Sequence, residues 1–286
     1  MIRAGEAEDA LAAGKAAAVR LDYDAAIASF STLIRLTPKD GLGYYLRGWV
    51  YGQKGDWAAA IKDCSTSLEF NPRAPGVYFS RAWAYANSKD LDRALSDANT
   101  AVGLDPSYAK AFGLRGSILE EKGEAEKALA DYSQSILLDP KSPFGYVTRS
   151  NWYHEHGEIA LAAKDLLEAL RLSPDDPEIL NDVAWYMATS PDATVRNPAK
   201  SLQYAEKACD LTHWKNAGYI DTLAAAYAEI GDFEEAVKWQ QKAVALTPKG
   251  EHTAELAEHL KLYLQKQPYH DPPKPTKSAP GEGRIN

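Results

Sequence analysis

The sequence predicts an all-α fold, a solenoid of tandem antiparallel helix hairpins. Three observations lead to this prediction: prolines recur at an interval of 34 residues, amphipathic stretches lie between them, and a short turn divides each interval in two. A proline cannot continue a helix but suits the start of the next one. The interval therefore divides the chain into repeats of two helices, which bury their apolar faces by stacking on one another.

The repeat boundaries follow from the prolines. Five of them are spaced 34 residues apart, and the sixth follows after two further periods plus six residues. We therefore predict a lead-in over residues 1–6 and seven repeats, the sixth with a six-residue insertion. The prolines are Pro38, Pro72, Pro106, Pro140, Pro174 and Pro248. The predicted repeats are 7–40, 41–74, 75–108, 109–142, 143–176, 177–216 and 217–250.

Each repeat consists of two expected helices, A and B, joined by a turn. In the second repeat the A helix should end at Gly55, because glycine readily adopts the left-handed conformation that closes a helix, and Asp56 should cap the B helix. In the sixth repeat the insertion lies in ATSPDATVRNPAK, where two prolines predict a loop. Asn197 can cap the helix that follows, with Pro198 at its first position.

Two segments follow the last repeat. Residues 251–267 have Leu256, Leu260 and Leu264 at four-residue spacing, which predicts an amphipathic helix. It would serve as the capping helix that the end of a solenoid needs. Residues 268–286 are polar and rich in proline, which predicts a disordered tail.

Composition bounds the class of partner. The 286 residues include 45% hydrophobic and 25% charged residues, and the formal net charge is −8. That charge argues against binding to nucleic acid or to an anionic membrane surface. No apolar run is long enough to cross a bilayer, so no membrane insertion is expected. The chain shows no secretory signal, which leaves the localisation open between a soluble cytoplasmic protein and, if a leader was removed, a periplasmic or exported one.

The sequence contains no constellation typical of an enzyme. His154 and His156 flank Glu155, but residues two apart point to different sides of a helix, and no third ligand lies nearby in the sequence. Cys64 and Cys209 lie more than four repeats apart, so we expect two core residues rather than a disulfide. We expect no catalytic residue, no metal and no cofactor.

A second regularity couples the two helices of a repeat. Four repeats have arginine at repeat position 7 and also aspartate at position 23, whereas the other three have neither. Their joint presence and absence predict four partly buried ion pairs between helices A and B, with bidentate geometry. The pairs are Arg47 with Asp63, Arg81 with Asp97, Arg115 with Asp131, and Arg149 with Asp165.

The period and its residues resemble the tetratricopeptide repeat (TPR) family over residues 7–250. The family has an aromatic residue at position 4, a small one at 8, an aromatic at 11, alanine at 20 and proline at 32. The second repeat has Tyr44, Gly48, Tyr51, Ala60 and Pro72 there. The resemblance implies a right-handed superhelix whose A helices line a concave groove. The block from NDVAWYMATS through the seventh repeat also resembles a module of bacterial repeat proteins.

The resemblance places repeat positions 2, 5, 9, 12 and 13 on the groove. Here they hold several aromatic residues, which often anchor partners, and acids from the fourth repeat onward. We therefore expect a protein or peptide ligand with an apolar or aromatic anchor followed by basic residues. Alternatively, the rings pack between repeats and the acids form a solvated surface. The candidate residues are Tyr45, Trp49, Phe79, Trp83, Phe144, Asn151, Trp185, Glu120, Glu121 and Glu155.

Two functions remain open at this point. The first is a protein–protein interaction scaffold that binds a peptide or helix of a partner in the concave groove. The second is a self-associating structural component of a larger bacterial assembly. Some chaperone-binding members of the family grip a terminal carboxylate with a lysine and an asparagine in the first repeat. Leu11 and Lys15 stand at those positions, which disfavours that role.

Overall fold

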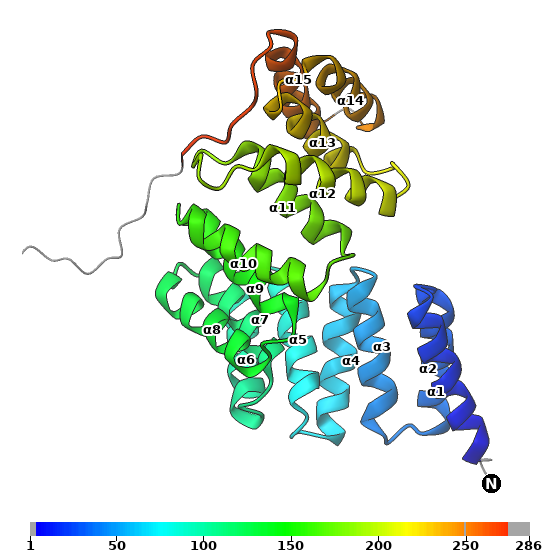
Figure 1. Cartoon of the computed structure of the whole chain (residues 1–286). Helices are drawn as coiled ribbons and strands as arrows, with labels where there is room; N and C mark the ends of the chain where they lie inside the picture. The colour runs from blue at the N-terminus through cyan, green and yellow to red at the C-terminus, as the bar shows by residue number, and fades with distance from the viewer. Residues whose placement is uncertain (1–3, 249, 274–286) are drawn as a thin grey trace, which may run out of the picture. The chain divides into compact units, whose positions relative to one another are not determined.

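The computed structural model describes residues 4–248 and 250–273. Within these residues the chain forms fifteen α-helices and no strand, which confirms the predicted all-α helical repeat fold (Figure 1). The chain divides into two compact units, one ending at Asp139 and one beginning at Pro140, here called unit 1 and unit 2. In both units, helices pair as consecutive antiparallel hairpins.

Unit 1 contains four hairpins. Each odd-numbered helix is an A helix, which packs against the B helix that follows it and, from the second hairpin on, against the B helix of the preceding hairpin. The helices are α1 (Ala4–Val19), α2 (Tyr23–Leu36), α3 (Gly41–Gln53), α4 (Trp57–Phe70), α5 (Pro75–Asn87), α6 (Leu91–Leu104), α7 (Ala109–Glu121) and α8 (Ala125–Leu138). Helix α1 begins at Ala4 and so includes part of the expected lead-in.

Unit 2 contains three hairpins and a final helix. The helices are α9 (Pro143–Glu155), α10 (Ile159–Leu172), α11 (Pro177–Thr189), α12 (Pro198–Leu211), α13 (Ala217–Glu229), α14 (Phe233–Leu246) and α15 (Glu251–Leu264). Helix α15 contacts both α14 and α13, so it takes the place of one further A helix. The insertion forms the connection from Ser190 to Asn197, and the Asn197 side chain accepts a hydrogen bond from the Lys200 backbone N–H at the start of α12.

The turns inside the hairpins close by the predicted left-handed conformation. Gly55 has a φ of +82° and Gly123 a φ of +81°. In the first and third hairpins, whose turns lack glycine, Leu21 and Lys89 adopt positive φ instead, which costs a residue with a side chain about 1–2 kcal/mol. Asp22, Asp56 and Asp90 then cap the B helices that follow.

The small residues of the repeat let helices A and B approach closely. A Cβ atom added to Gly116 would lie 2.7 Å from the ring of Tyr132 and 3.2 Å from the carbonyl oxygen of Ala128. Tyr132 is buried, so its ring has no free space into which it could move. Gly103 in α6, by contrast, has no neighbour within 4 Å of such an atom.

We expect Gly116→Ala to destabilise the protein by about 1–3 kcal/mol, because overpacking outweighs the better helix propensity of alanine. The control, Gly103→Ala, should be neutral or stabilise by up to about 1 kcal/mol. Urea denaturation followed by circular dichroism measures both. Equal stabilisation by both variants would contradict the close contact at Gly116.

The C-terminal tail differs from its prediction as a disordered segment. Residues 268–273 form a defined extended segment that lies on helices α11, α13 and α15, where its side chains make hydrogen bonds and ring contacts. These helices present aromatic and hydrogen-bonding side chains at the end of the repeat array, and the tail supplies a tyrosine and an aspartate that pair with them. The rest of the expected tail, residues 274–286, lies outside the described residues.

Candidate functional site

The A helices of unit 1 differ in how far they expose the predicted groove residues. On α3, Leu42 is 40% exposed and Trp49 is 38% exposed. Tyr45, on the same helix, is half-buried against Cys64, Leu68 and Val77, all of which are buried. Leu42 and Trp49 are therefore the most exposed large apolar side chains of α3.

The aromatic candidates on α5 pack between neighbouring helices. The ring of Trp83 lies edge-on to that of Trp57, with centroids 5.2 Å apart, and also covers Gly52 of the preceding A helix. The ring of Phe79 lies 5.3 Å from that of Tyr108. Both candidates are half-buried, so most of each ring contributes to packing between repeats.

The acidic candidates of unit 1 already have partners in the chain. The Tyr132 hydroxyl donates a hydrogen bond of 2.7 Å to Glu120 Oε2. Glu121 pairs with Lys89 at 3.0 Å, and both side chains are well exposed. An ion pair in water contributes little stability, so Glu121 can exchange Lys89 for another cation at small cost.

Three further candidates lie on α9 of unit 2. Phe144 is 41% exposed, and Asn151 and Glu155 are also exposed. Trp185, on α11, is half-buried because the tail covers it.

Each of the four arginines at repeat position 7 contacts the aspartate sixteen residues later. Nε donates to Oδ2 at 2.7 Å in every pair, and Nη2 donates to Oδ1 at 2.8 to 2.9 Å. The aspartates are buried and the arginines half-buried. The hydrogen bonds that each arginine donates to its aspartate raise the pKa of the arginine. Each pair thus links helices A and B of one hairpin.

The arginines also contact the preceding B helix, which the sequence reasoning missed. Nη1 of Arg47 donates to the Ser31 hydroxyl at 3.0 Å, and Nη1 of Arg81 donates to Ser65 at 3.0 Å. Nη1 of Arg115 donates to Asn99 Oδ1 at 3.1 Å. A polar residue sixteen positions before each arginine is the sequence signal that could have revealed this contact. Each of these arginines thus ties three helices together.

In unit 2, the tail lies on A-helix positions that the sequence predicted to line the groove. The Asp271 carboxylate accepts hydrogen bonds from Trp185 Nε1 at 3.0 Å and from the Thr189 hydroxyl at 2.6 Å. The Asp271 backbone N–H donates to the Thr189 carbonyl at 2.8 Å, which satisfies one of the open carbonyls at the end of α11. The Tyr269 ring lies 4.2 Å from that of His259 and 5.8 Å from that of Trp185.

Beneath this segment lies a buried polar cluster. Asp221 on α13 accepts hydrogen bonds from Gln240 Nε2 at 2.6 Å and from His259 Nδ1 at 2.9 Å. Burial lowers the pKa of His259, but the hydrogen bond and the charge of Asp221 outweigh it, so the pKa is raised above the ordinary 6.5. Nearby, Glu229 pairs with Arg196 at 3.0 Å and with His270 at 2.7 Å.

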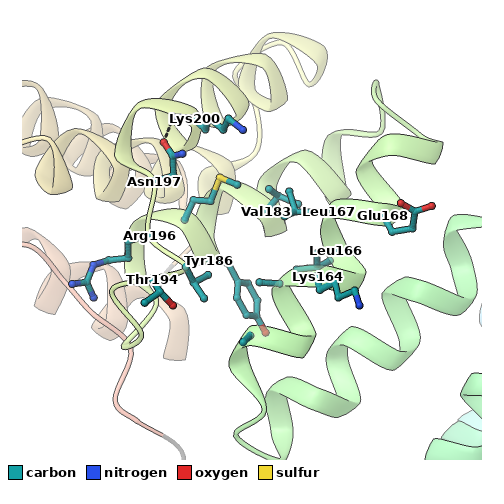
Figure 2. Close-up of a pocket in the computed structure, with 14 residues that line it drawn as sticks. Lys164, Leu166, Leu167, Glu168, Val183, Tyr186, Thr194, Arg196, Asn197 and Lys200 are labelled. Carbon is teal, nitrogen blue, oxygen red and sulfur yellow. Dashed lines mark hydrogen bonds between the residues drawn. The ribbon is translucent and has the colours of Figure 1, made fainter.

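Unit 2 also contains two sizeable cavities. One, of about 740 Å³, is lined in part by Asn181, Trp185, Asp221 and Glu255. The other, of about 660 Å³, lies between α10, α11 and the insertion (Figure 2). Figure 2 shows Leu166 and Leu167 of α10 on one side of it and Thr194 and Arg196 of the insertion on the other. The second cavity has no lining residue at a predicted groove position.

Comparison with known proteins agrees with this architecture. Two family profiles described as Tetratricopeptide repeat match the chain, one at residues 11–76 and 79–143 and the other at residues 119–252. The chain belongs to the tetratricopeptide repeat family. Its repeats indicate a protein–protein interaction scaffold, and members of the family are generally non-enzymatic.

Solved structures with the same fold come from bacteria and from yeast. A thermophilic TPR protein of Thermus thermophilus is 24% identical, with a TM-score of 0.57 over 60% of this chain and 94% of that one. PilF of Pseudomonas aeruginosa is 17% identical, with a TM-score of 0.63 over 76% and 96%. Yeast Tom70 is 15% identical, with a TM-score of 0.62 over 85% and 50%. No curated protein sequence matches the chain.

Two searches of the described part of the chain bear on other classes of function. None of the described helices is both long and apolar enough to cross a membrane. Among the described side chains, no group of three or more histidine, cysteine, aspartate or glutamate residues is placed to hold a metal ion.

Proposed function

We propose that this protein is an interaction scaffold that binds a peptide or helix of a partner protein on the surface of its A helices. The observation that carries the proposal is the exposure of Leu42 and Trp49 on α3. They occupy positions 2 and 9 of an A helix, and side chains seven residues apart lie on the same side of a helix. Large apolar side chains that remain exposed on one surface mark an interaction site.

The other aromatic candidates of unit 1 are less available to a partner than Trp49. Tyr45 and Phe79 lie at repeat position 5 and Trp83 at position 9, yet all three pack largely against neighbouring helices. Packing between repeats thus explains those three rings, whereas it does not account for the exposed part of Trp49. An indole that becomes fully buried on binding is a typical anchor of an interface.

The partner should present an apolar or aromatic side chain to Leu42 and Trp49. A basic residue of the same partner can pair with Glu121, which lies on α7 and pairs with the exposed Lys89. The expected ligand therefore carries an apolar or aromatic anchor and a basic residue, and its affinity should fall moderately with added salt.

Affinity capture from lysate of the source organism tests this proposal. We expect Trp49→Ala to weaken binding of the specific partner by about 2 kcal/mol or more, because it removes the indole that the partner would bury. The matched control is Leu137→Ala, which removes an exposed apolar side chain from a B helix. Retention of every captured protein by Trp49→Ala would refute an anchor on α3.

A further inference from the structure

The tail of this protein contacts its own A-helix surface in the manner of a bound peptide. The chain leaves α15 by a turn at Lys266, whose φ is +56°, and then runs extended over residues 268–272. Its contacts fall at Trp185 and Thr189 of α11, at Glu229 of α13 and at His259 of α15. On their helices these are positions 9, 13, 13 and 9, which belong to the ligand-binding set of the repeat.

Two side chains of the tail account for most of the recognition. Tyr269 places its ring against His259 and Trp185, and Asp271 receives the Trp185 and Thr189 donors. The Tyr269 hydroxyl also donates to Asp271 Oδ1 at 3.2 Å, which holds the two side chains together. The Tyr269 ring thus packs against the rings of Trp185 and His259. Two residues later, the Asp271 carboxylate accepts hydrogen bonds from Trp185 and Thr189.

The charges around the tail make this contact exchangeable. The Asp271 carboxylate lies at the C-terminal end of α11, where the helix dipole disfavours an anion. Its hydrogen-bond donors from α11, the Trp185 indole and the Thr189 hydroxyl, are uncharged. On α13, His270 contacts Glu229, an acid that Arg196 also pairs. The tail is therefore held by ring contacts, by hydrogen bonds to uncharged donors at Asp271 and by the contact of His270 with Glu229.

We propose that residues 268–272 are an intramolecular ligand that masks a second binding site, formed by Trp185, Thr189, Glu229 and His259. The partner of this site is an extended peptide with the same pattern, an aromatic residue followed two positions later by aspartate. It binds by displacing the tail. This inference rests on the proposed function, since it assigns the A-helix surface of unit 2 a ligand class and a regulation.

A peptide titration on the full-length chain tests the proposal. The probe is a fluorescently labelled peptide, Gln-Pro-Tyr-His-Asp-Pro-Pro, which copies residues 267–273. The unmasked protein is the full-length Tyr269→Ala/Asp271→Ala variant. We expect the peptide to bind this variant about tenfold or more tightly than the wild type, because the tail occupies the wild-type site.

Two controls separate recognition from general loosening of the fold. A probe with alanine in place of its aspartate should bind the unmasked variant about tenfold more weakly, since it loses the hydrogen bonds to a charged group. Adding Trp185→Phe to the unmasked variant keeps a ring but removes the indole donor, and should weaken binding of the intact probe. Adding Trp57→Phe instead, which changes a tryptophan of the B helix α4, should leave binding of the probe unchanged.

Three results would overturn the proposal. The first is equal binding of the probe to the wild type and the unmasked variant, and the second is no binding to either, which would make the tail a purely structural clamp. The third is a wild-type oligomer, seen by sedimentation, that dissociates with Asp271→Ala, because the tail would then occupy a second copy. None of these results depends on Trp49, so they leave the proposed function of unit 1 to its own test.

Discussion

Replacing Asp97 by alanine is expected to cost about 3 kcal/mol of stability. The Arg81 guanidinium would lose both of its bonds to the carboxylate, 2.7 and 2.9 Å long, while it remains packed between α4, α5 and α6. Breaking one partner of a buried pair costs about 3–5 kcal/mol, because a charge is left without compensation. The Arg81 side chain is 20% exposed, so water can reach it and the lower end of that range applies.

Urea denaturation followed by circular dichroism measures the loss, and hydrogen exchange of α5 and α6 shows where it occurs. The matched control is Asp24→Ala, which removes an ion pair to Lys54 that is exposed on both sides. Exposed pairs contribute about 0–1 kcal/mol, so the control should change little. If the two variants lost the same stability, burial would not be the reason why the Arg81 pair contributes to the fold.

Replacing Asp221 by alanine should destabilise unit 2 by about 3–5 kcal/mol, the other large effect. Gln240 and His259 are buried side chains that both donate to this carboxylate. A buried polar group without a partner costs about 1–3 kcal/mol, and breaking a buried charged pair costs about 3–5 kcal/mol. His259 loses its bond to the carboxylate, and Gln240 keeps its bond of 3.0 Å to the Leu256 carbonyl but loses the one to Asp221. The tail should loosen as well, since His259 supports the ring of Tyr269. Thermal unfolding measures the first effect, and hydrogen exchange of residues 268–272 the second.

Asp221→Asn separates the charge from the hydrogen bonds. Asparagine keeps an acceptor oxygen for Gln240 or His259, so its loss of stability should be clearly smaller than that of alanine. An outcome in which Asn and Ala are equally harmful would mean that the negative charge, and not the acceptor, holds the cluster together.

The pair of Asp221 and His259 makes the stability of the fold depend on pH. The folded-state pKa of His259 is raised above its ordinary value of 6.5. Protonated His259 therefore stabilises the fold fully below about pH 6.5, and this contribution is lost as the pH rises through the raised pKa. Asp221 faces His259 from α13, while Glu255 and Asp271 add negative charge from α15 and the tail. The melting temperature of the wild type should thus fall as the pH rises from about 6.5 through the raised pKa of His259. In Asp221→Asn this decrease should be smaller. Thermal unfolding at a series of pH values measures both.

Several features could be predicted from single residues and their spacing. The interval between prolines sets the hairpins, and Asp56 with Gly55 marks a turn that the structure contains. The spacing of Arg81 and Asp97 placed them on facing helices, because positions 7 and 23 of a hairpin with a short turn must face each other. Such features depend on the geometry of one repeat, which a local pattern determines.

Other features could not be predicted from the residue pattern of a single repeat. Trp49 and Trp83 occupy the same repeat position, yet Trp49 is the more exposed of the two. Trp83 is covered because its ring packs against Trp57 and against Gly52, which has no side chain. The second contact of Arg81, with Ser65, crosses from one repeat to the preceding one. Both depend on how neighbouring hairpins stack, which involves pairs of residues that no single repeat contains.

By itself the sequence determined the repeat, the order of its helices, the family and the ion pairs within four of the hairpins. Only the tertiary structure decided which groove residues remain exposed and what covers Trp185. Composition marks residues 268–273 as polar and proline-rich, which is typical of a disordered tail. Their placement depends instead on Trp185, Thr189 and His259, which come from helices far apart in sequence and meet only when the repeats stack.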